Sequence, residues 1–142
     1  MLVTALYDAG QDITVHAVVA LTGGRCVGTS QGRNAGGPAG ISDTGDGNVR
    51  VGLPTANGAI FGVAENDCPV NGKVNCLRPP KVVPIECSAA VPAGADLSVD
   101  ADGRVKARAA GQTPVGRNIG PATTVAGQYV QAELFLAGAS YA

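Results

Sequence analysis

Few side chains in this chain of 142 residues have the types and spacing that catalysis requires. The single histidine, His16, could act as a general base only beside a nucleophile or an orienting carboxylate, and the sequence shows no such arrangement. The glutamates, Glu65, Glu86 and Glu133, form no obvious pair of the kind that glycoside hydrolysis uses. Phosphate-binding loops, nucleophile elbows and zinc-protease motifs are also missing from the sequence. We therefore expect no enzyme activity, no catalytic residue and no cofactor, and we expect His16 at the surface or at a subunit contact.

The acidic residues indicate turns more than metal ligands. The run 100–103 begins like a calcium loop, but an EF-hand would need glycine at its sixth position and glutamate at its twelfth. Those positions hold Val105 and Gly111, so we predict a hairpin turn here and no metal site. A weaker alternative lies in a glycine-rich loop, where the side chains that could ligate a hard cation are Asp43, Asp46 and Asn48.

The four cysteines do not have the spacing of a structural zinc site, which usually takes its ligands as close CxxC-type pairs. They are Cys26, Cys68, Cys76 and Cys87. Residues 1–7 lack the basic segment of a secretory leader, so we expect a reducing compartment and free thiols that serve as small core residues. One disulfide, or a metal site, remains an alternative to this interpretation.

Charge and hydropathy exclude two classes of partner. The chain carries 10 basic and 11 acidic residues without blocks of either sign, which gives no footprint for a phosphate backbone. The apolar run 13–21 is much shorter than the roughly 20 residues that cross a bilayer. We expect neither nucleic-acid binding nor membrane insertion.

The elements that must position these side chains are short and β-rich. Aromatic residues are scarce, with 3 Tyr, 2 Phe and no Trp, whereas 21 Gly and 9 Pro divide the chain into short segments. No segment shows apolar residues at helical spacing, and valine-rich strands separated by roughly 8–12 residues favour a sandwich or barrel. We predict an all-β fold, a single small β-barrel or β-sandwich of short antiparallel strands over 13–136, with a thin core of small β-branched residues.

Within this predicted domain, residues 13–21 and 25–28 are expected to pair as an opening hairpin. Residues 29–48 form a long glycine-rich loop, which is either a surface loop or a loop ordered by a neighbouring subunit. Residues 81–86 contain Pro84 and are expected to form an edge strand, which either only protects the sheet or also contacts a neighbour.

Two terminal segments lie outside the predicted domain. Residues 1–12 form an N-terminal arm that is either disordered or adds as a strand to the sheet of a partner. Residues 137–142 form a C-terminal tail.

An ordered series of glycine-based turns and strand ends resembles a known family. It includes Phe61-Gly62-Val63-Ala64, Gly72-Lys73-Val74, Val91-Pro92-Ala93-Gly94-Ala95, Asp102-Gly103-Arg104-Val105, Ile119-Gly120, and a final Gly127 with Val130 and Leu134-Phe135. In this order over residues 12–136, the chain is similar to the small capsid decoration, or head-cement, proteins of tailed phages that infect actinobacteria. The four cysteines and the tail depart from that pattern.

The resemblance implies a structural protein that is made in the cytoplasm of the bacterial host and binds the outer surface of an icosahedral capsid. It further implies the major capsid protein as partner, a homotrimeric state and no catalytic residues. Capsid or subunit contacts are expected in the arm, the long loop and the edge strand, at Leu2, Val3, Thr4, Ala5, Leu6, Tyr7, Arg33, Asn34, Lys81 and Val82. A receptor- or carbohydrate-binding module is the alternative, for which exposed aromatic residues would be needed.

Overall fold

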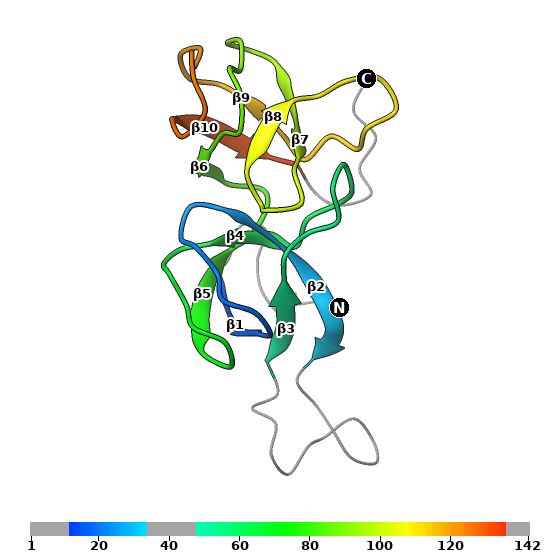
Figure 1. Ribbon diagram of the computed structural model, residues 1–142, viewed down its shortest axis with the longest axis vertical. Coiled ribbons are helices and arrows are strands. Elements are labelled where there is room, and N and C mark those ends of the chain that lie inside the picture. The colour runs from blue at the N-terminus through cyan, green and yellow to red at the C-terminus, as the bar shows by residue number, and fades with distance from the viewer. Residues whose placement is uncertain (1–11, 34–47, 136–142) are drawn as a thin grey trace, which may run out of the picture.

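The computed structural model describes residues 12–33 and 48–135, and these residues form an all-β fold without helix (Figure 1). The all-β prediction is therefore confirmed. The strands are β1 (Ile13–Ala17), β2 (Cys26–Arg33), β3 (Val49–Gly52), β4 (Gly62–Ala64), β5 (Lys73–Leu77), β6 (Val82–Glu86), β7 (Asp96–Val99), β8 (Val105–Ala107), β9 (Gly116–Asn118) and β10 (Tyr129–Leu134). No helix among the described residues is long and apolar enough to cross a membrane.

The first five strands close into a barrel in the order β1-β3-β2-β4-β5. β1 pairs in parallel with β3 and antiparallel with β5, so it is the strand that closes the ring. Val15 and Ala17 of β1 are fully buried inside this barrel together with Val51 and Cys76. Side chains of this size suffice to fill the interior of a narrow barrel. The alternation predicted for β1 is confirmed, and His16 lies on the outer side between its two buried neighbours.

Two expectations about the start of the chain are wrong. β1 and β2 do not form a hairpin, since β3 and β5 occupy both edges of β1. Residues 29–33 also belong to a strand rather than to the predicted loop, because β2 runs on to Arg33 and pairs with β3 across an irregularity after Thr29. Backbone pairing to a valine-rich neighbour thus extends β2 through residues whose side chains show no strand pattern.

The last five strands form a second sheet in the order β6-β10-β9-β7-β8. The edge strand predicted over 81–86 is confirmed as β6, which stands at one end of this order. At the other end, Cys87 forms a parallel bridge with Val105 of β8, and the N–H of Ser88 donates to the Val105 carbonyl at 2.8 Å. The backbone that follows β6 therefore covers part of the β8 edge, which limits edge-to-edge pairing with other chains.

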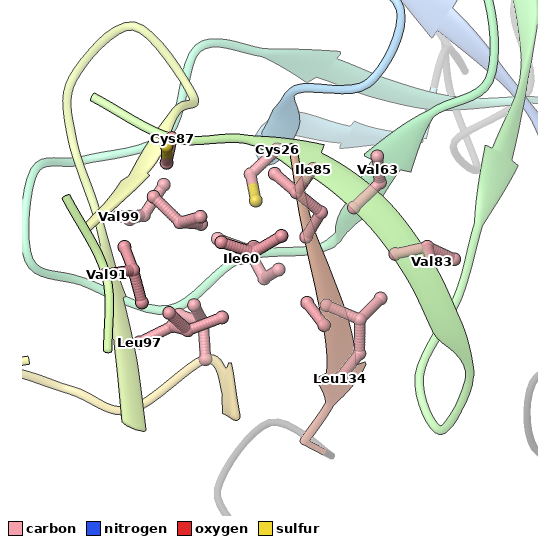
Figure 2. Packing of buried hydrophobic residues seen from close by; sticks show 14 residues of the cluster. Cys26, Ile60, Val63, Val83, Ile85, Cys87, Val91, Leu97, Val99 and Leu134 are labelled. Atoms are coloured by element: carbon pink, nitrogen blue, oxygen red, sulfur yellow. The ribbon is translucent and has the colours of Figure 1, made fainter. Parts of the chain in front are cut away.

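One hydrophobic cluster joins the barrel to the second sheet. Cys26, Ile60 and Val63 come from the part of the chain that builds the barrel, and they pack among side chains of the second sheet (Figure 2). The largest fully buried side chains are Ile85, Leu97, Leu134 and a set of valines. This agrees with the thin core of small residues that the composition predicts.

The two sheets also share backbone hydrogen bonds along the seam between them. The N–H of Cys26 donates to the carbonyl of Gly103 at 2.8 Å, and the N–H of Glu86 donates to the carbonyl of Gly24 at 3.0 Å. The predicted turn at 100–103 is confirmed by a hydrogen bond from the N–H of Gly103 to the carbonyl of Asp100 at 3.0 Å. This turn therefore also helps to hold the second sheet against the barrel, since it is hydrogen-bonded to Cys26, the first residue of β2.

The four cysteines are buried and unpaired, as expected for small core residues. Burial raises the pKa of the Cys76 thiol to about 12, and burial followed by the nearby Cys76 raises the pKa of Cys26. The Cys87 Sγ lies 3.4 Å from the hydroxyl of Thr123, which itself accepts a hydrogen bond from the N–H of Val91 at 2.9 Å. The thiols of Cys26 and Cys76 are thus neutral core groups in the folded protein.

Candidate interaction surface

Lys81, an expected contact residue, is joined to the root of the N-terminal arm. Its Nζ lies 2.6 Å from Oδ1 of Asp12, the first residue that the structure describes. Asn75 Nδ2 donates to the same carboxylate at 3.4 Å and to Glu65 Oε2 at 2.8 Å. The ammonium group of Lys81 therefore already has a partner within the chain.

The other expected contacts fall into three groups. Val82 begins β6 and is 52% exposed, so it is available to a partner. Arg33 ends β2 opposite Val49. The remaining positions lie outside the described residues, and they are Leu2, Val3, Thr4, Ala5, Leu6, Tyr7 and Asn34, together with the alternative cation ligands Asp43 and Asp46.

The outer face of β6, β10 and β9 is a surface that the expected contacts did not include. Along β10 the side chains alternate strictly between exposed and buried, and the outward set is Tyr129, Gln131 and Glu133. The strand register places Glu86 opposite Tyr129, Pro84 opposite Gln131, and Val82 opposite Glu133. On the other side, the N–H of Ile119 donates to the carbonyl of Gln131 at 2.9 Å. We call this surface the β10 face, and its members are Val82, Pro84, Glu86, Arg117, Ile119, Tyr129, Gln131 and Glu133.

The β10 face is chemically mixed. Val82, Ile119 and Tyr129 are each more than half exposed. Polar groups lie between them. Arg117 is opposite Glu133, and its Nε lies 3.0 Å from Oδ1 of Asp96 in β7. The face is therefore amphipathic, with apolar groups interleaved with hydrogen-bonding ones.

A charged cluster borders the β10 face at the seam between the two sheets. The carboxylate oxygen Oε2 of Glu86 lies 3.0 Å from Arg25 Nη2 and 3.7 Å from Arg104 Nη1. Arg104 Nε in turn lies 2.7 Å from Asp102 Oδ2. Partial burial raises the pKa of Asp102, but the backbone N–H and the guanidinium of Arg104 outweigh this effect and hold that pKa below its usual value. The cluster thus sets two guanidinium groups against two carboxylates, and its positive and negative charges balance.

Tyr129 of the β10 face packs against the barrel at Gly24. A Cβ atom at Gly24 would lie 2.9 Å from Cε1 of Tyr129, so the ring packs directly against this glycine. Gly24 has a φ of 77°, a conformation that favours glycine in any case. The ring is thereby held in place from the barrel side, while 54% of the residue stays exposed.

A separate hollow of about 260 Å³ lies beside the start of β4. Its lining residues are Thr29, Ala59, Ile60, Phe61 and Arg78. The guanidinium carbon of Arg78 lies 4.0 Å from the centre of the Phe61 ring, and its Nη1 donates to the Phe61 carbonyl. The Arg78 guanidinium and Phe61 therefore contact each other at the wall of the hollow.

No group of three or more histidine, cysteine, aspartate or glutamate side chains among residues 12–33 and 48–135 could hold a metal ion. The sequence carried one signal for the β10 face that the expected contacts left out. It is the alternation of Tyr129, Gln131 and Glu133 with the apolar Val130, Ala132 and Leu134. That pattern predicts an outer face, but the partners on β6 and β9 depend on the register between strands.

Comparison with known proteins supplies a likeness of fold. No protein-family model matches the chain, and no curated protein matches its sequence. The fold is similar to the crystal structure of the N base of the head fibre gp8.5 of bacteriophage phi29, with a TM-score of 0.66 and 19% identity. The likeness covers 88% of this chain and 93% of that one. It therefore spans the barrel and the second sheet together, and it establishes a shared fold.

Proposed function

We propose that this protein is a structural component of a bacteriophage head, and that it binds the outer surface of the icosahedral capsid and stabilises it. The observation that carries this proposal is the fold likeness to the base of a phage head fibre, which extends over nearly the whole of both chains. The ordered turn motifs that resemble head-cement proteins point independently to the same kind of particle. The protein acts by binding, without catalysing a reaction.

The described surface suits binding through many modest contacts. Single apolar side chains such as Leu53, Val70 and Val125 are exposed on different loops, and each offers only a small area. A lattice of identical capsid subunits multiplies such weak contacts, because every additional contact forms at a high effective concentration. The partner in this proposal is the major capsid protein.

A closed homotrimer is the assembly that we propose on the capsid. Cyclic symmetry lets each protomer cover apolar surface of its neighbour, and a thin-cored protomer gains stability from that contact by mass action. The N-terminal arm and the long loop remain the proposed contact segments, with the exposed Val82 beside the arm's root.

The proposal is tested with phage heads assembled with and without this chain. We expect the purified protein to sediment with heads that lack it, up to a saturating ratio, and to raise the temperature at which those heads release their DNA. Unassembled capsid protein is the control, since a lattice-dependent binder does not co-sediment with it. Equal thermal stability with and without saturating protein would exclude a stabilising role, and failure to bind heads would exclude the whole proposal.

A further inference from the structure

The ring of Tyr129 is an exposed aromatic surface at a fixed position. Gly24 supports one edge of the ring. The chain neighbours of Tyr129 are also fixed, since Val130 pairs with β6 and the Gln128 carbonyl accepts a hydrogen bond from the N–H of Cys87 at 2.8 Å. The electron-rich face of an aromatic ring attracts positively polarised C–H groups. A ligand whose flat side presents such groups would stack on it at little cost in side-chain entropy.

Hydrogen-bonding groups surround that ring on the same face. Glu86 lies directly opposite Tyr129, and its carboxylate is held by Arg25 and Arg104. Gln131 lies two residues along β10 on the same side, roughly 7 Å away by strand geometry, and its amide both donates and accepts hydrogen bonds. Arg25 contributes indirectly, because its Nη2 holds Glu86 Oε2 at 3.0 Å and so fixes that carboxylate beside the ring. These groups offer donors and acceptors around the ring, which a polyhydroxyl ligand requires.

Charge balance decides the class of ligand. The guanidinium groups of Arg25 and Arg104 are matched by the carboxylates of Glu86 and Asp102, so the site has no excess charge to attract a phosphate or an acidic chain. Pro84 and Ile119 border Gln131 with small apolar surfaces. A neutral sugar combines apolar C–H faces with hydroxyl groups at its rim, and this alternation matches that of the β10 face.

We propose that Tyr129, with Glu86, Arg25 and Gln131, forms a binding site for a neutral pyranose ring within an oligosaccharide. The ring stacks on Tyr129, its hydroxyl groups bond to Glu86 and Gln131, and neighbouring sugars lie along β10. The site goes beyond the proposed capsid role and does not depend on it. On a head it would give the particle a weak affinity for glycans.

The test is a titration of the full chain, followed through its backbone amide NMR signals. The probes are maltotriose, cellotriose, chitotriose and mannotriose, each taken to millimolar concentration, the range of a weak single site. We expect saturable shifts, with at least one probe, at the amides of 24–25, 86 and 129–131. No saturable shift with any probe would overturn the proposal, and so would shifts confined to other parts of the chain.

Variants separate the stacking role from a general change of structure. Tyr129→Ala is expected to weaken binding by about tenfold or more, whereas Tyr129→Phe keeps the ring and stays within about threefold. Gln131→Ala should also weaken binding, by a smaller factor. Leu53→Ala is the matched control, because Leu53 has the same exposed fraction as Tyr129, 54%, and lies on the connection after β3. Binding by Tyr129→Ala equal to that of Leu53→Ala would overturn the site.

A second copy of the chain is the competing occupant of this surface. In that case the signals of 129–131 would shift with protein concentration in the absence of any sugar, and added trisaccharide would not reverse the shift. That result would contradict the glycan site while leaving the proposed capsid role intact. Conversely, if trisaccharide binding saturates but the chain does not bind phage heads, the glycan site stands and the proposed capsid role fails.

Discussion

Gly103 and Cys26 are in direct backbone contact across the seam between the second sheet and the barrel. The N–H of Cys26 donates to the Gly103 carbonyl at 2.8 Å, and a Cβ atom at Gly103 would overlap the carbonyl oxygen of Cys26. The φ of Gly103 is 88°, which an L side chain rarely adopts. The turn between β7 and β8 can therefore approach β2 only because residue 103 has no side chain.

Gly103→Ala is accordingly expected to destabilise the protein strongly. The backbone strain at positive φ costs about 1 kcal/mol, and the overlap with a backbone atom brings the total to about 3 kcal/mol or more. Gly94→Ala is the control, since Gly94 has a φ of 75° but no atom within 4 Å of the position that an alanine Cβ would take. Urea unfolding measures both, and equal losses for the two variants would contradict the close approach at the seam.

Ile60→Ala should weaken both sheets at once. Ile60 precedes β4 of the barrel yet packs in the cluster of the second sheet, and truncating such a buried side chain costs about 2–5 kcal/mol. We expect a single unfolding transition, shifted to lower urea concentration, when far-UV circular dichroism and amide exchange follow the unfolding. Leu53→Ala, at an exposed site, should change stability by less than about 0.5 kcal/mol. Two separated transitions would show that the sheets unfold independently.

The ion pair between Lys81 and Asp12 should contribute little to stability. Both side chains are about one-third exposed, and pairs in such positions are worth about 0.2–1 kcal/mol. A double-mutant cycle with Lys81→Ala and Asp12→Ala is expected to give a coupling in this range that shrinks at high salt. The pair of Lys106 and Asp100, with 2.9 Å between Nζ and Oδ1 and similar exposure, serves as a reference pair whose coupling is expected to be of similar size. A coupling that salt leaves unchanged would contradict a solvent-screened pair.

The buried thiols should make the protein sensitive to alkali. Burial raises the pKa of Cys76 from 9.0 to about 12, so in this range the unfolded chain releases a proton that the folded chain keeps. The contribution of this thiol to the free energy of unfolding is therefore constant below pH 9 and falls as the pH rises from 9 towards 12. Cys76→Ala should flatten that fall, although it lowers stability at neutral pH. Urea midpoints measured across this pH range check the sign, and a Cys76→Ala variant that keeps the full slope would contradict it.

The strand content and the core composition were predictable from local patterns. Alternation of Val15 and Ala17 with polar neighbours, the turn at 100–103 and the edge proline at Pro84 each depend on residues close together in the chain. The pairing of β1 was not predictable in the same way. Both edges of β1 are taken by strands far along the chain, and no local pattern reports which distant strand pairs with which.

The candidate site shows the same division. That Tyr129, Gln131 and Glu133 share one side of β10 follows from the two-residue period of a strand, which is readable from the order of the residues. That Tyr129 rests on Gly24, and that Glu86 receives Arg25 and Arg104, becomes visible only when the chain is folded. The reason is physical: these groups meet where two sheets pack, and their positions depend on register, crossing and a shared core rather than on neighbours in sequence.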